Sequence, residues 1–301
     1  MPNSDKNLDT HLWSEIDSLC PATEIQIGIP NETSLLFKEL LFTGVDEDFA
    51  RHRNNTLSNA TSNEELVDYI MEHGNAMTYF ELAYVISSID QEVISLAPIF
   101  NPDEEEYLKP SAASFEANTY PLLRRLRLAM FNDETSLEST RVLLDFGLFS
   151  EAGNNATKSV GLWPIDRWEK ILMATRVQSA NGVAIADIEE YCSDAGDAIS
   201  IAGSSTVYPV ARLWSSIYQI GCPGNVVAVE GGGSSVGAGR VCGNPEHGDP
   251  IDIGDMSRHW KDSEATVSSN GFLYQCLEPG DATRSAIQID VAIDGLTVAG
   301  K

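Results

Sequence analysis

The chain has 301 residues, of which 43% are hydrophobic, enough to bury one large core or two smaller ones. Forty-five acidic residues against 19 basic residues give a formal net charge of −26. This excess of negative charge repels the phosphate backbone of DNA or RNA, and the sequence has no basic stripe to overcome the repulsion, so we expect no nucleic-acid partner.

Nothing in the sequence predicts a segment that crosses a membrane. No run of about 18 or more apolar residues occurs, so we expect no direct membrane insertion. Residues 1–5 lack the charged and apolar regions of a secretory signal, so we expect any export signal to lie outside the chain.

The five cysteines show no Cys-x-x-Cys spacing of the kind that binds metals, so we expect free thiols or disulfides and no metal site. Cys222 and Cys242 flank a predicted strand and a glycine-rich loop and could form a disulfide, which favours an extracellular, periplasmic or cell-surface location. The odd number leaves at least one thiol unpaired within the chain. Four glycosylation triplets also fit a secreted protein, and they begin at Asn31, Asn54, Asn59 and Asn155.

Residues 1–118 alternate short strands with helices, which predicts one α/β lobe. Residues 62–65 form a capping box, and Gly74 is expected to end the helix that begins there. We expect, in chain order, a strand at 24–29, a helix at 34–41, this capped helix, a mixed aromatic and apolar segment at 77–85, a strand at 96–100 and an acidic surface loop at 101–109.

Residues 119–164 predict a strand followed by a helix. Arginines interleave with apolar residues over 120–131, and a helical pattern runs from 136 to 149 and ends near Gly153. Residues 165–196 contain a predicted helix at 168–176 and a polar bridge, and we interpret them as a connector.

Residues 197–301 repeat one pattern: an apolar strand, a loop of glycine and hydroxyl residues, and a helix. The first copy has its strand at 199–202, its loop at 203–206 and an apolar helical stripe from Val210 to Tyr218. The second copy has a strand at 226–229, then a loop at 231–235 and a helix of small residues.

These two loops suit a tetrahedral oxyanion. The first turn of a helix presents free backbone N–H groups at the positive end of the helix dipole, and serine and threonine hydroxyls add donors. Ser205 and Thr206 in the first loop, and Ser234 and Ser235 in the second, are therefore candidate ligands of one anion. The alternative is that Ser205 and Ser234 only cap their helices.

A third predicted strand end, at residues 252–258, adds further polar side chains. Ser257 can donate a hydrogen bond, Arg258 can pair with an anion through two N–H groups, and Asp255 can accept the proton of a protonated oxyanion. The alternative for Asp255 and Arg258 is a local salt bridge.

Residues 203–209, 233–240, 252–258 and 289–296 resemble, in order and spacing, the first half of the phosphate-binding protein of Pst-type phosphate ABC transporters. The resemblance implies an α/β fold with two lobes, of the type II periplasmic-binding-protein class, that holds inorganic phosphate between the lobes. It places five residues on the ligand, namely Ser205, Thr206, Val207, Ser234 and Ser257.

The N-terminal part resembles the remainder of the same family, at residues 13–16, 76–85 and 120–124. The two halves therefore stand in swapped order, which implies a circular permutation or a cut through a tandem array. On this interpretation residues 1–118 are the second lobe, incomplete at its N-terminal side, 119–164 return to the first lobe, 165–196 are the connector, and 197–301 are the first lobe, ending at the hinge between lobes.

One turn departs from the family pattern. Where the family has Ser-Gly-Thr and an upstream arginine, this chain has Asn31, Glu32 and Thr33, with Ile27 in place of the arginine. Asn31 and Thr33 remain candidate donors, so the resemblance implies phosphate binding at lower affinity. Arg124 matches another arginine of the family and is expected either to compensate or to form a structural ion pair.

Three functions follow, in order of preference. The first is a solute-binding module that captures inorganic phosphate by hinge motion, without chemistry on the ligand and without a cofactor. The second is a structural or assembly module of an extracellular polymer, with a weakened phosphate site and neighbouring copies of the same module as partners. The third and weakest is an enzyme, because the five histidines lie on unrelated segments and predict neither a metal cluster nor a nucleophile with its base.

Overall fold

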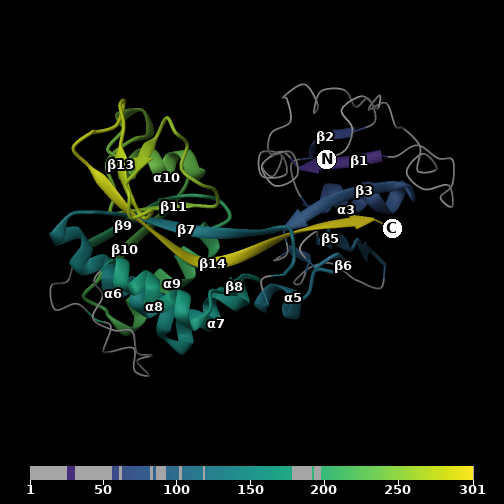
Figure 1. The fold of residues 1–301 in the computed structure, drawn as a ribbon, viewed down its shortest axis with the longest axis horizontal. Coiled ribbons are helices and arrows are strands. Elements are labelled where there is room, and N and C mark those ends of the chain that lie inside the picture. Colours follow the sequence, from purple (N-terminus) through teal and green to yellow (C-terminus); the bar gives the residue numbers. More distant parts are fainter. Residues whose placement is uncertain are drawn as a thin grey trace. The chain divides into compact units, whose positions relative to one another are not determined.

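The computed structural model describes residues 26–30, 56–60, 63–81, 84–85, 93–101, 104–117, 119–177, 192 and 198–300. The chain divides into two compact units (Figure 1). Unit 1 comprises Met1–Leu122 and Gly295–Lys301, and unit 2 comprises Leu123–Asp294. The predicted helix at 34–41 lies outside the described residues. The lobe boundaries expected at residues 118, 164 and 196 stay predictions.

Unit 1 contains a sheet with the strand order β14-β3-β1-β2. The strand β1 (Gln26–Pro30) runs parallel to β2 (Thr56–Ala60) and to β3 (Ala76–Glu81). The end of β14 (Ser285–Gly300) runs antiparallel to β3. The strand predicted at 24–29 corresponds to β1.

One face of this sheet is covered by α3 (Asn63–Glu72). Leu66 and Ile70 lie one turn apart on α3 and are fully buried, in a cluster with Phe80 of β3 and Ala299 of β14. The helix predicted from the capping box is therefore confirmed. The shorter α5 (Ala112–Glu116) follows later in the unit, and its N-terminal amides are capped by the Ser111 side chain.

Two short pairings in unit 1 differ from the prediction. β4 (Ser95–Leu96) pairs with β14, whereas β5 (Ile99–Asn101) forms a hairpin with β6 (Glu106–Leu108), so the single strand predicted at 96–100 is interrupted. The acidic segment predicted as a loop contains β6. This strand escaped prediction because its central side chain, Tyr107, is exposed and the segment has no apolar alternation.

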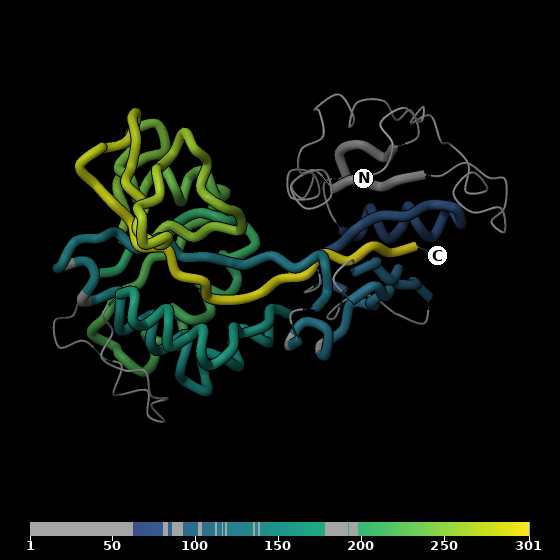
Figure 2. Tube along the Cα trace, in the orientation of Figure 1, coloured from purple at the N-terminus to yellow at the C-terminus, as the bar shows by residue number. Residues whose placement is uncertain are grey.

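Unit 2 is built on a sheet with the strand order β10-β9-β11-β7-β14. β9 pairs in parallel with both β10 and β11, and β7 runs antiparallel to β11. β7 and β14 are far apart in the sequence but lie side by side (Figure 2). Besides β14, the strands of this sheet are β7 (Leu123–Phe131), β9 (Ala198–Gly203), β10 (Val226–Gly231) and β11 (Ile253–Met256).

Helices cover both faces of this sheet. The side chains of β9 and β11 alternate, so that Ile201 and Ile253 join the larger core cluster while Ala202 and Met256 join the smaller one. The helices packed in the larger cluster are α6 (Glu134–Phe149), α7 (Glu151–Ser159), α8 (Arg167–Arg176) and α9 (Tyr208–Gly221), and α10 (Ser234–Val241) packs in the smaller cluster.

The helix α8 confirms the helix predicted at 168–176, and Asp166 caps it. Its residues Met173 and Ala174 are buried in the larger core cluster of unit 2. The described part of the expected connector therefore packs as part of the unit. The remaining short elements are β8 (Trp163–Pro164), η3 (Pro245–His247), β12 (Ala265–Val267) and β13 (Leu273–Cys276).

The predicted disulfide between Cys222 and Cys242 is wrong. Cys222 is bonded to Cys192, and Cys242 is bonded to Cys276, with Cα atoms 5.3 Å and 5.5 Å apart. Cys222 ends α9 and belongs to the larger core cluster, whereas Cys242 ends α10 and belongs to the smaller one. The sheet separates the two cysteines, and a disulfide cannot bridge such a distance.

Candidate anion-binding site

The loop between β9 and α9 begins with a close approach of two backbones. Gly203 has a φ of +147°, and a Cβ atom there would lie 2.2 Å from the carbonyl oxygen of Asp255 and 2.3 Å from its Oδ1. Only glycine fits at this point. The N–H of Ser204 then donates to the carbonyl oxygen of Asp255 at 3.0 Å, which fixes the start of the loop against β11.

The first loop does not use Ser205 as the helix cap. The N-cap of α9 is Val207, which makes no side-chain capping bond, and the Ser204 hydroxyl accepts a hydrogen bond from the N–H of Thr206 at 3.2 Å. Because Val207 is the N-cap, the interpretation of Ser205 as only the cap of α9 is not supported. The first turn of α9 has few free amides, since the N–H of Tyr208 donates to the Ser204 carbonyl oxygen at 2.9 Å and Pro209 has no N–H.

The loop between β10 and α10 lies directly against the first loop. Gly232 and Gly233 have φ angles of +146° and +89°, and the N–H of Gly233 donates to the carbonyl oxygen of Gly203 at 2.6 Å. A Cβ atom at Gly237 would lie 2.7 Å from the carbonyl oxygen of Asp255. The small residues of α10 thus let this helix pack onto the ends of β9 and β11.

Ser234 and Ser257 are brought together from two loops. The Ser234 Oγ accepts a hydrogen bond from the N–H of Ser257 at 3.1 Å, and the two hydroxyl oxygens lie 3.3 Å apart. The N-cap of α10 is Gly233, so Ser234 is the first helical residue and not its cap. The structure therefore gathers hydroxyl groups at the start of α10.

Asp255 is a fully buried acid at the end of β11. Within the described part of the chain neither carboxylate oxygen has a hydrogen-bond partner. Burial raises the pKa of Asp255 to about 7, and the nearby backbone amides of Ser204 and Asp255 offset only part of this effect. Near neutral pH this side chain can thus be either a carboxylate that accepts a proton or a carboxylic acid that donates one.

Arg258 forms its ion pair with Glu264 and not with Asp255. It forms a bidentate pair with Glu264, with N–O distances of 2.6 Å and 2.9 Å, and also donates to the Ser235 hydroxyl at 2.9 Å. No salt bridge between Arg258 and Asp255 is present among the described contacts. The guanidinium group of Arg258 therefore holds the Ser235 hydroxyl in place, and its two parallel N–H groups bind Glu264 instead of an anion.

Arg124 forms a structural ion pair, one of the two roles considered for it. Its guanidinium group forms a buried ion pair with Asp294 at 2.6 Å and donates to the Thr206 hydroxyl at 3.2 Å. The expected ion pair is thus present. Through Thr206 this pair also holds the loop that precedes α9.

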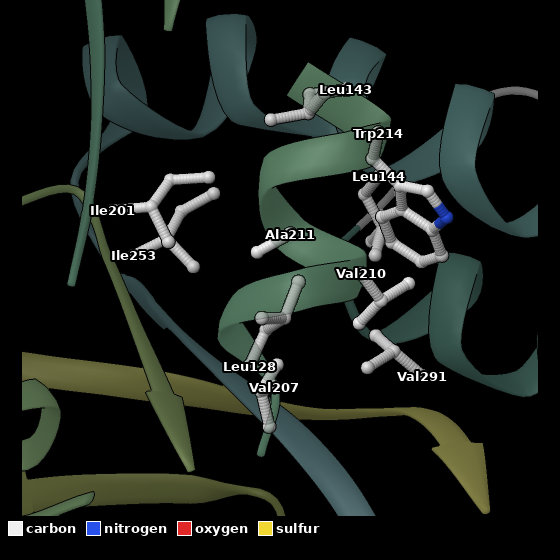
Figure 3. Close-up of a pocket in the computed structure, with 10 residues that line it drawn as sticks. All are labelled: Leu128, Leu143, Leu144, Ile201, Val207, Val210, Ala211, Trp214, Ile253 and Val291. Carbon is white, nitrogen blue, oxygen red and sulfur yellow. The ribbon is translucent and has the colours of Figure 1, made fainter. Parts of the chain in front are cut away.

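A small apolar cavity lies beneath α9 (Figure 3). Its space of about 10 Å³ is at the lower limit for one water molecule, so we assign it to core packing. Because the Val207 side chain lines it, this residue can offer an anion only its backbone N–H. The lining residues are Leu128, Leu143, Leu144, Ile201, Val207, Val210, Ala211, Trp214, Ile253 and Val291.

The expected donors Asn31 and Thr33 lie outside the described residues, and of Ile27 only the backbone is described. In the described part of the chain, His, Cys, Asp and Glu side chains form no group that could hold a metal ion. No helix in those same segments is long and apolar enough to cross a membrane. The sequence did not single out Glu264 or Lys261, although both follow the third strand end by a few residues.

Comparisons with known proteins bear on the fold. No protein-family model matches the sequence, and no curated protein matches it. The structure of a phosphate-binding protein of a phosphate ABC transporter from Streptococcus pneumoniae is similar, with a TM-score of 0.61 and 16% identity over 92% of this chain and 88% of that chain. An ABC transporter substrate-binding protein from Listeria monocytogenes matches 79% of this chain and 54% of its own at 10% identity, with a TM-score of only 0.38.

The first likeness, together with the strand order of the two units, shows the α/β fold of type II periplasmic-binding proteins. The fold that the sequence resemblance implied is therefore confirmed. The identity is too low to transfer a ligand.

Proposed function

We propose that the chain is a solute-binding module that captures inorganic phosphate at the ends of β9, β10 and β11. The observation that carries this proposal is the convergence of the three loops, in which Ser257 donates to Ser234 and Gly233 donates to Gly203. Hydroxyls and amides at the starts of α9 and α10 act at short range, where the net charge of −26 is screened. The similar protein from Streptococcus pneumoniae is described as phosphate-binding.

Asp255 gives the proposed site a means to choose its ligand. Above about pH 7 its carboxylate is ionised and can accept the proton that phosphate carries, whereas sulfate has no proton to give. Sulfate would therefore meet an uncompensated carboxylate. This selection needs no chemistry on the ligand, so the proposed role is binding and not catalysis.

Isothermal titration at pH 8 with phosphate and with sulfate tests the proposal. We expect one phosphate to bind per chain and the affinity for sulfate to be at least tenfold lower, since an unpaired buried polar group costs about 1–3 kcal/mol. No heat with phosphate up to millimolar concentration would contradict it.

We also propose that the chain works outside the cytoplasm, because two disulfides persist in oxidising compartments. We further propose that the two halves of the chain stand in swapped order relative to the phosphate-binding proteins. It is supported by β7, which precedes β9 in the chain but lies between β11 and β14 in the sheet.

A further inference from the structure

Lys261 differs from the other cations around the candidate site. The guanidinium groups of Arg258 and Arg124 are each balanced by a carboxylate, from Glu264 and Asp294 respectively. The ammonium group of Lys261 forms no ion pair with any acid of the described segments, and its hydrogen-bond partner is the Ser235 hydroxyl at 3.3 Å. One positive charge is thus unbalanced beside the start of α10.

The backbone holds Lys261 in this position. Its N–H donates to Glu264 at 2.9 Å, the same carboxylate that pairs with Arg258. Arg258, Lys261 and Glu264 therefore form one connected turn after β11. The turn joins the third loop, which carries Ser257, to the helix start that carries Ser235.

The Ser235 hydroxyl is oriented by the two cations. A serine hydroxyl has two acceptor positions and one donor. Arg258 donates to this oxygen at 2.9 Å and Lys261 at 3.3 Å, so both acceptor positions are taken. The hydroxyl proton must then point away from both cations, and two adjacent positive charges make it a stronger donor.

We propose that Lys261 sets the affinity of this site for a tetrahedral oxyanion, by supplying its unbalanced positive charge and by polarising Ser235. The inference rests on the proposed phosphate binding. The other donors of the site are neutral, and α10 adds only the partial charge of a helix N-terminus. The exposed ammonium group of Lys261 next to these donors therefore contributes to binding and to its dependence on salt.

The test compares phosphate titrations of the full chain and of Lys261→Gln, Lys261→Arg and Lys158→Gln at low and high ionic strength. We expect Lys261→Gln to weaken phosphate binding about tenfold at low salt, as for the loss of one charge-assisted hydrogen bond, and to flatten the salt dependence. Lys261→Arg should stay within about threefold of the unaltered chain because it keeps the charge. Lys158 is exposed near the end of α7, so Lys158→Gln makes the same chemical change in another part of unit 2.

Three outcomes would overturn the inference. Equal phosphate affinity for Lys261→Gln and the unaltered chain would show that Lys261 does not act on the ligand. Equal losses for Lys261→Gln and Lys158→Gln would show an effect of net charge alone. If the unaltered chain binds no phosphate, the proposed function fails first and this inference falls with it. A circular dichroism melt of each variant checks that it is folded. If Lys261→Gln does not fold, loss of phosphate binding in a folded Lys261→Arg variant still contradicts the inference.

Discussion

Asp255 is the residue whose surroundings differ most from those of an ordinary acid. It is buried at the end of β11 without a hydrogen bond to either carboxylate oxygen among the described residues. Its pKa is raised from 3.8 to about 7 because burial disfavours the charged form. The folded chain therefore binds this proton more tightly than the unfolded chain does. As a result, the free energy of unfolding falls as the pH rises from about 4 through 7.

Asp255→Asn removes this titration and should change how stability depends on pH. The free energy of unfolding of the variant, relative to the unaltered chain, should rise between pH 4 and pH 8 by on the order of 4 kcal/mol. Urea unfolding at several pH values measures it. Asp249→Asn, at an exposed position, serves as the control and should show no such slope. A difference independent of pH would show that Asp255 ionises normally in the folded state.

Ser234 is predicted to matter more for binding than for folding. Ser234→Ala removes the acceptor of the Ser257 N–H and one hydroxyl donor of the candidate site. We expect phosphate affinity to fall about tenfold and the free energy of unfolding to fall by only about 1 kcal/mol. Calorimetric titration and urea unfolding give the two values. The control is Ser216→Ala, which removes an exposed hydroxyl on α9 that bonds only within its helix; an equal effect of both variants on affinity would argue against the site.

At the scale of elements, the repeated pattern in residues 197–301 was informative because it is local. An apolar strand, a glycine and hydroxyl loop and a helical stripe each show in neighbouring residues, and β9, α9, β10 and α10 follow in that order. The positions of Ser234 and Ser257 in this pattern show why the two residues could be predicted to lie close together. Both follow strand ends, and the ends of β10 and β11 lie on either side of β9.

The disulfide pairing could not be predicted, because it depends on which face of the sheet each helix packs against. Cys222 and Cys242 are close in the sequence but lie in different core clusters, and each pairs with a more distant cysteine. The alternative of a local salt bridge between Asp255 and Arg258 is not found either, because burial and reach decide the partner of Arg258. Asp255 is nearer in sequence, but its carboxylate is buried, whereas Glu264 lies within reach on the turn after β11.

The disulfide between Cys242 and Cys276 ties α10 to β13, and its loss should be costly. It closes a loop with a sequence separation of 34, for which chain entropy predicts about 4 kcal/mol of stabilisation. The double variant Cys242→Ser with Cys276→Ser should lose roughly that free energy of unfolding in guanidinium titrations. Cys20→Ser leaves both disulfides intact and is the matched control. A loss below about 1 kcal/mol would show that the bond adds little to the fold.

The packing of α6 against α9 predicts that Gly147→Ala lowers stability, although alanine favours a helix more than glycine does. Gly147 lies inside α6, where alanine would ordinarily stabilise the helix by about 1 kcal/mol, but a Cβ atom there would lie 2.2 Å from the Trp214 ring. The ring cannot yield easily because Trp214 donates to Gly153 at 3.0 Å and to Thr157 at 3.1 Å. Gly147→Ala should therefore destabilise by about 2 kcal/mol in urea unfolding. Gly224→Ala meets open space and should change stability by less than about 0.5 kcal/mol; a stabilised Gly147→Ala would contradict this packing.

At the scale of the whole molecule, the net charge of −26 opposes both folding and anion binding. Added salt screens this repulsion, since the Debye length falls from about 10 Å at 0.1 M to about 3 Å at 1 M. Potassium chloride should therefore raise the melting temperature to some extent. A ligand adds a second and separate stabilisation, because it binds the folded chain and not the unfolded one.

These two effects separate when melting temperatures are measured in potassium chloride, potassium sulfate and potassium phosphate at matched ionic strength. Chloride should report screening alone. Beyond the stabilisation that sulfate gives, bound phosphate should add about 2.7 kcal/mol to the free energy of unfolding at a concentration a hundredfold above its dissociation constant, and this extra part should shrink in Lys261→Gln. Sulfate and phosphate both stabilise proteins by exclusion from their surface, so sulfate measures this contribution, which should be the same in Lys261→Gln as in the unaltered chain. A melting temperature that phosphate raises no more than sulfate does would leave the effects of charge and exclusion standing and remove the case for a bound anion.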